Sequence, residues 1–182
     1  MKTDARVRYT KKVIQEHFTK LLSKKTLDKI TVKSICDAAE INRTTFYKYY
    51  TDVYDLMQQI EDETLIGLHE LMEVTNSKNI EDILEVVLGA ILKQKEYFML
   101  LFYKQDIHSF NEKLILLCYQ TKQLEISNSL SSASVREQEW FYYFLAQGSS
   151  SILDCWVQGG MKDDPCMVSR FISERYYQLL GR

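Results

Sequence analysis

The chain has 182 residues and is 46% hydrophobic, which is enough apolar material for a packed core and excludes a disordered chain. One proline and six glycines are too few turn residues for a multi-stranded protein, so we expect an all-helical fold. The formal net charge of −2 is unevenly distributed along the chain. Residues 1–60 hold 12 Lys and Arg against 7 Asp and Glu, whereas the remaining residues hold 11 against 18. We therefore expect only the first third of the chain to contact a polyanion.

Helical periodicity is clear in the first part of the chain, where apolar residues recur three or four positions apart. Thr31 and Asp52 have side chains suited to capping the starts of helices. The elements predicted in this part are a helix over 3–23, a polar connection over 24–29, a helix over 32–39, a turn over 40–42, a short helix over 43–50 and a longer helix from 53 onward.

The segment NSKN at 76–79 interrupts this periodicity, and we take it as a domain boundary. Beyond it, Gly159 and Gly160 are expected to end one helix and Pro165 to begin the last. The helices predicted here are 80–91, 97–103, 110–130, 135–157 and 165–180. The predicted organisation is therefore a first domain over 1–52, a connecting helix over 53–79 and a larger helical domain over 80–182.

Several classes of protein are not expected from this sequence. The amino terminus, MKTDARVRYTKK, is charged where a signal peptide needs an apolar stretch, and no long apolar window is present, so we expect a cytoplasmic protein without a membrane partner. The four cysteines form no C-x-x-C pair, so we expect reduced, mostly buried thiols and neither a metal site nor another cofactor. An enzyme is not expected, because the sequence has no glycine-rich phosphate loop and no nucleophile elbow.

Residues 31–50 have the pattern of a helix-turn-helix, in which a tight turn holds a second helix across a first. Ile41 is expected to fill the turn, and Phe46 and Tyr50 to anchor the second helix at i and i+4. The residues left outward on that helix are Arg43, Thr44, Tyr47, Lys48 and Tyr49. Their guanidinium, hydroxyl and amine groups suit the base edges and phosphates of DNA, although by composition alone they suit the solvated face of a surface helix equally well.

The string ITVKSICDAAEINRTTFYKYYTDVYDL resembles the amino-terminal domain of TetR-family regulators. The matching positions are Thr31-Val32, Ile35, Ala39, Thr45-Phe46-Tyr47 and Tyr50 through Leu56, and with the preceding helix the likeness covers about residues 6–60. It implies a TetR-like all-α fold, with a three-helix DNA-binding domain and a larger domain for effector binding and dimerisation. The run from Asp52 to Leu56 is similar to a subgroup that includes regulators of dihydroxyacetone kinase operons.

The resemblance also implies roles at the DNA for individual side chains, while Phe46 and Tyr50 remain packing residues. The implied contacts are base-edge and phosphate contacts for Arg43 and Thr44, a phosphate contact for Tyr47, a base or backbone contact for Lys48, and flanking phosphate contacts for Thr31 and Lys33.

Three positions depart from the family pattern. Glu40 replaces the usual turn glycine, so either a non-glycine residue takes a left-handed conformation or the turn differs. Val53 replaces a frequent lysine and removes an expected phosphate contact, for which Tyr54 is a candidate substitute. Tyr49 stands in place of a familiar histidine.

The larger domain holds most of the aromatic residues. In TetR-like proteins this domain encloses an effector, and rings with polar tips suit an apolar or planar small molecule; the candidate pocket residues are Tyr103, Tyr119, Trp140 and Tyr143. The resemblance implies a four-helix bundle between two protomers, formed by the last two helices; the candidate interface residues are Tyr142, Leu145, Ile152, Trp156, Phe171 and Tyr176. An ordinary intramolecular core competes with both interpretations.

Together these features predict a ligand-responsive repressor that binds a double-stranded DNA operator as a homodimer and responds to an unknown small-molecule effector. Two alternatives stay open. One is a transcriptional activator, which the subgroup likeness permits as readily. The other is a co-regulator that binds DNA weakly and acts through protein–protein interaction, which Glu40 and Val53 favour.

Overall fold

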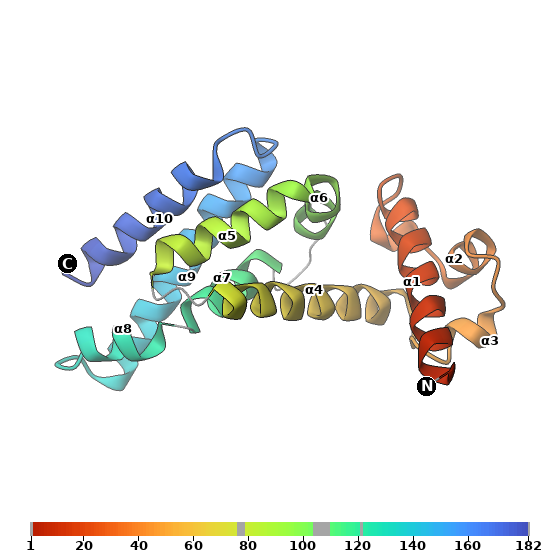
Figure 1. The fold of residues 1–182 in the computed structure, drawn as a ribbon, viewed down its shortest axis with the longest axis horizontal. Helices are drawn as coiled ribbons and strands as arrows, with labels where there is room; N and C mark the ends of the chain where they lie inside the picture. Colours follow the sequence, from red (N-terminus) through yellow and green to blue (C-terminus); the bar gives the residue numbers. More distant parts are fainter. Residues whose placement is uncertain (1, 76–78, 104–109, 121, 182) are drawn as a thin grey trace. The chain divides into compact units, whose positions relative to one another are not determined.

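The computed structural model describes residues 2–75, 79–103, 110–120 and 122–181; the side chains of 2–4, 103 and 123–125 lie outside that description. All regular secondary structure in these ranges is helical, which confirms the all-α prediction (Figure 1). The elements are α1 (Lys2–Leu22), a 3-10 turn η1 (Leu27–Lys29), α2 (Val32–Ala38), α3 (Arg43–Phe46), α4 (Val53–Thr75), α5 (Ile80–Lys93), α6 (Lys95–Tyr103), α7 (Phe110–Gln120), α8 (Gln123–Ser129), α9 (Val135–Gln158) and α10 (Pro165–Leu179).

The chain divides into two compact units, Met1–Thr64 and Leu65–Arg182, and the division falls within α4. The predicted boundary at 76–79 lies mostly outside the described residues. Its last member, Asn79, begins the next helix, because its side-chain oxygen accepts a hydrogen bond of 2.9 Å from the backbone N–H of Glu81. The first unit therefore holds α1, α2, α3 and the beginning of α4.

The first unit is built around an apolar core that its sequence pattern predicts. From α1, Ile14, Phe18 and Leu22 are buried at intervals of four residues, as one face of a helix requires. From α2 and α3, Ile35 and Phe46 have no exposed surface. This packing holds α2 against α1 and α3 against α2.

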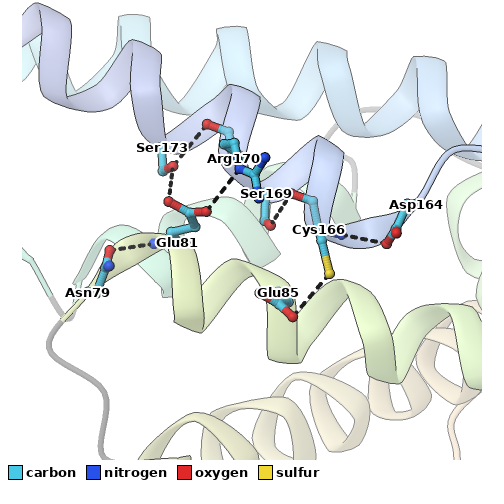
Figure 2. Close-up of polar contacts among 8 residues, drawn as sticks. All are labelled: Asn79, Glu81, Glu85, Asp164, Cys166, Ser169, Arg170 and Ser173. Atoms are coloured by element: carbon cyan, nitrogen blue, oxygen red, sulfur yellow. Dashed lines mark hydrogen bonds and ion pairs between the residues drawn. The ribbon is translucent and has the colours of Figure 1, made fainter.

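The second unit is dominated by α5 against α10 and α7 against α9. Polar side chains join α5 and α10 along one side (Figure 2). Glu81 accepts a 3.3 Å hydrogen bond from the Ser173 hydroxyl and pairs with Arg170 at 3.5 Å, and the Cys166 thiol donates to Glu85 at 3.1 Å. α10 packs against α5 and also against α9, and Met167, Phe171 and Leu179 of this helix remain exposed.

The four cysteines are all free thiols. Cys36 and Cys118 are buried, Cys166 is half-buried and Cys155 is exposed. The hydrogen bond to Glu85 raises the pKa of Cys166 to about 11, and burial raises the pKa of Cys118 to about 12, so both stay protonated at neutral pH. Within the described residues, no group of three or more His, Cys, Asp or Glu is arranged to hold a metal ion.

The helix predicted over 110–130 is wrong. The continuous helix expected over 110–130 is two helices, α7 and α8, and Lys122 between them has φ −112 and ψ 8. The Lys122 N–H bonds to the carbonyl of Tyr119, three residues back, which tightens the end of α7 into a turn.

In the described part of the chain, no helix is long and apolar enough to cross a membrane.

Candidate functional site

The start of α2 is fixed by a reciprocal pair of hydrogen bonds. The Thr31 hydroxyl accepts from the Ser34 N–H, and the Ser34 hydroxyl accepts from the Thr31 N–H, each at 3.1 Å. This capping box satisfies two backbone donors, so the helix begins where the sequence predicts. Thr31 and Lys33 are both exposed, which leaves their side chains open to an outside partner.

The turn after α2 shows which backbone conformation Glu40 adopts. Glu40 has φ 54, so a non-glycine residue does occupy the left-handed region. The Ile41 N–H bonds to the carbonyl of Cys36 at 3.0 Å, which is the long-range bond of a helix-ending motif that glycine normally completes. The turn therefore places a non-glycine residue in the conformation that glycine usually supplies, at a conformational cost.

Replacing Glu40 with glycine is expected to raise the free energy of unfolding by about 1 kcal/mol, because the left-handed conformation penalises a residue with a Cβ atom. Urea unfolding of both proteins measures the change. Glu40→Gln is the control, since it removes the charge but keeps the Cβ atom, and it should unfold like the parent protein. Equal stability of the glycine variant and the parent would contradict the prediction.

The next helix, α3, is capped by a residue that the sequence analysis did not single out. The Asn42 side-chain oxygen accepts from the Thr45 N–H at 2.8 Å and from the Thr45 hydroxyl at 2.9 Å. Asparagine directly before a predicted helix is a recognisable capping signal. The regular helix ends at Phe46 rather than at Tyr50, because the N–H of Tyr49 bonds three residues back and closes a tighter turn.

Packing fixes which side of α3 is outward. Phe46 and Tyr50 have 0% and 1% of their surface exposed, and their rings lie 5.4 Å apart, so both are packing residues as predicted. Arg43, Thr44 and Lys48 are exposed. Tyr47 is 56% exposed, whereas Tyr49 is half-buried and presents less of its ring. Four of the five residues predicted to face outward are thus exposed, and Tyr49 is half-buried.

Val53 and Tyr54, the first two residues of α4, lie in different environments. Val53 is buried, so its side chain packs inside the unit. Tyr54, the next residue of α4, is 62% exposed. The start of α4 is held by Asp52, whose carboxylate accepts from the Asp55 N–H at 2.8 Å.

In the second unit, the candidate pocket residues separate into two environments. Tyr119 is buried, and its hydroxyl forms a 2.8 Å hydrogen bond with Ser149. Trp140 and Tyr143 are 59% and 62% exposed on α9. Tyr103 has its side chain outside the described part. Of this set, only Tyr119 is therefore seen in the interior.

The candidate interface residues differ in how deeply they are buried. Leu145, Trp156 and Tyr176 are buried within their own unit, and Tyr176 stacks on Tyr119 at 5.6 Å. Tyr142 and Ile152 are half-buried. Phe171 is 46% exposed. Several exposed large apolar residues lie on α9 and α10, and we group six of them under the name outer apolar face: Trp140, Tyr143, Phe144, Met167, Phe171 and Leu179.

A sequence model of a TetR protein family, described as a transcriptional regulator C-terminal region, matches residues 78–175, which is more than half of the chain. The chain belongs to the TetR family of transcriptional regulators. No curated protein sequence matches it significantly. The family match covers the part of the chain in which the sequence alone showed only a general layout, and it confirms the family predicted from residues 6–60.

Solved structures of this family share the fold. The dihydroxyacetone kinase operon activator DhaS has 17% identity and a TM-score of 0.63, over 94% of this chain and 96% of that one. A TetR transcriptional regulator from Streptococcus agalactiae 2603V has 20% identity and a TM-score of 0.60, over 92% and 98%. The fatty acid degradation regulator FadR from Bacillus halodurans has 13% identity and a TM-score of 0.59, over 94% of each chain.

Proposed function

We propose that this TetR-family regulator binds a double-stranded DNA operator through α3, as a homodimer, and represses transcription until a small molecule binds its second unit. The observation that carries the DNA-binding part is the exposure of Arg43, Thr44, Tyr47 and Lys48, on α3 and the turn after it, while Phe46 and Tyr50 in the same stretch are buried. We call residues 43–48 the recognition helix. A rigidly backed helix with outward donors is what reading of the major groove requires.

The roles that we propose follow the chemistry of each group. Arg43 reads a base edge, because a guanidinium donates two parallel hydrogen bonds. Thr44 and Tyr47 donate to phosphates through their hydroxyls, and Lys48 contacts a base or the backbone. Thr31 and Lys33 on α2, with Tyr54 on α4, contact flanking phosphates. Tyr49 is a minor contributor because it is half-buried.

We propose the outer apolar face as the homodimer interface. Trp140 and Phe144 lie four residues apart on α9, and Met167 and Phe171 lie four apart on α10, so each helix presents its exposed apolar residues on one side. Large apolar side chains left exposed on neighbouring helices are typical of interaction sites. A twofold dimer also supplies the two recognition helices that half-sites one turn of DNA apart require.

We propose that the effector binds in the interior of the second unit, near Tyr119 and Tyr142. Their rings lie 6.3 Å apart, and the Tyr142 hydroxyl is buried without a hydrogen-bond partner among the described residues. Burial raises the pKa of both hydroxyls to about 12, so both are neutral donors at physiological pH. Such a site suits a largely apolar ligand that carries a hydrogen-bond acceptor.

The proposed response is a change in DNA affinity. Ligand binding in the second unit would shift α4 and change the separation of the two recognition helices. Genome-wide capture of bound DNA identifies the operator, and thermal-shift screening of small molecules identifies an effector. Operator affinity is expected to change by about 5- to 150-fold when the effector is present. Equal affinities with and without it would contradict a ligand-responsive mechanism.

The sign of regulation has one specific alternative. DhaS, which shares the fold, is described as an operon activator. A reporter gene placed behind the captured operator separates the two functions: deletion of the regulator raises expression for a repressor and lowers it for an activator. A protein that captures no specific DNA would instead be the DNA-weak co-regulator.

A further inference from the structure

Gln59, on the part of α4 that belongs to the first unit, uses all the hydrogen-bonding groups of its amide. Its oxygen accepts from the Lys11 ammonium of α1 at 3.1 Å. Its nitrogen donates to the backbone carbonyl of Tyr49 at 3.2 Å and to the Asp55 carboxylate at 3.0 Å. An ammonium can only donate, and a carbonyl or carboxylate can only accept, so these partners determine the orientation of the amide.

Two α4 side chains, Gln59 and Asp55, hold residues 49–51, which follow the recognition helix and which we call the recognition segment. Gln59 bonds the carbonyl of Tyr49, and Asp55 accepts from the Thr51 N–H at 2.7 Å and the Thr51 hydroxyl at 3.2 Å. The hydrogen bond from the Thr51 N–H, and to a lesser extent the one from the Gln59 amide, lowers the pKa of Asp55 below its usual value. The Asp55 carboxylate is therefore charged at neutral pH. Residues 49–51 are therefore attached to α4 at both ends.

Lys11 extends these contacts to α1. Its ammonium lies 3.8 Å from Glu63 and 5.5 Å from the centre of the Tyr50 ring. Glu63 in turn accepts a 2.7 Å hydrogen bond from Gln15, one turn further along α1. Gln59 thus stands where three elements meet: α1, the end of the recognition segment and α4.

We propose that Gln59 is a positioning residue for DNA reading: by joining Lys11 to the carbonyl of Tyr49, it sets the angle at which the recognition helix is presented. This inference rests on the proposed DNA-binding function. Gln59 is half-buried, and in this proposal it acts through the residues it holds and not by contacting DNA itself. Its loss should therefore reduce discrimination between sequences while leaving the phosphate contacts, and hence the salt dependence of binding, unchanged.

The test compares Gln59→Leu with Gln58→Leu, a matched change at the neighbouring position. Gln58 is exposed, and its amide bonds only to Asp62 within the same helix, at 2.8 Å. The probes are a duplex selected by the wild-type protein from random-sequence DNA and an unselected duplex of equal length. We expect Gln59→Leu to lower the ratio of the two affinities about tenfold, as the misplacement of a bidentate base contact would, and Gln58→Leu to leave it unchanged.

Amide hydrogen exchange supplies a readout that needs no DNA. The Thr51 N–H should exchange about tenfold faster in Gln59→Leu, because its partner Asp55 loses the hydrogen bond that orients it, and at the wild-type rate in Gln58→Leu. If Gln59→Leu does not fold, Gln59→Glu replaces it: that variant keeps the acceptor for Lys11, loses both donors, and is expected to show the same two effects.

The outcomes separate this inference from the proposed function. If wild-type protein selects no duplex, DNA binding is wrong, and exchange alone decides whether Gln59 holds the segment. If a duplex is selected but Gln59→Leu keeps the wild-type affinity ratio, or loses affinity for both duplexes equally, the positioning role is overturned. Unchanged exchange at Thr51 overturns it as well.

Discussion

Replacing Phe144 with glutamate is expected to convert the protein from a dimer to a monomer and to weaken operator binding by about 100-fold or more, because the avidity gained from two linked recognition helices is lost. Phe144 is 65% exposed on α9 in the single chain and becomes buried in the proposed dimer. A twofold axis places the new carboxylate in both copies of the interface, where an unpaired buried charge is strongly unfavourable.

Analytical ultracentrifugation measures the oligomeric state of this variant, and operator titration measures its affinity. Ile66→Glu is the matched control, since Ile66 is 59% exposed and lies on α4, a helix that contributes no residue to the outer apolar face. It receives the same charge and should remain dimeric with parental affinity. A Phe144→Glu protein that stays dimeric and binds as tightly as the parent would place the interface elsewhere.

Replacing Arg43 with alanine is expected to cost about 1 to 3 kcal/mol on the operator and to relax discrimination at one base position. Arg43 is the first residue of α3, is exposed, and carries the only guanidinium on the recognition helix. Truncating it removes two directional donors to a base edge without disturbing the buried face that holds the helix.

Titration of the operator and of single-base variants of it measures the loss at each position. Lys33→Ala is the comparison, because Lys33 is exposed on α2 and is proposed to contact a phosphate. That change should weaken binding to all sequences alike and lower the salt slope by about 1. Equal losses on operator and unrelated DNA for Arg43→Ala would argue that Arg43 meets a phosphate too.

The helix-turn-helix was predictable because its information is local. Phe46 and Tyr50 are spaced for one helical face, Thr31 is a capping residue, and both features follow from short-range geometry. At Glu40, sequence alone left two conformations open, since whether a left-handed residue is tolerated depends on the packing on either side of the turn. The structure decides for φ 54.

The contacts of Gln59 were not predictable from the sequence. Its three partners, Lys11, Tyr49 and Asp55, are separated from it by 48, 10 and 4 residues. A polar residue on an amphipathic helix is usually solvated, and no spacing rule connects it to a backbone carbonyl in the preceding turn. Only the meeting of three elements in space assigns it a role.

By itself the sequence determined the helical class, the family and the residues that turn outward on the recognition helix, because periodicity, caps and motif spacing are properties of neighbouring residues. It did not determine which aromatic residues of the second unit are buried. The run Trp140–Phe144 is aromatic at every position and so covers all sides of α9. Packing of α9 against α7, and of α10 against α5, decided that Leu145, Trp156 and Tyr176 form the core while Trp140 and Phe144 stay outside.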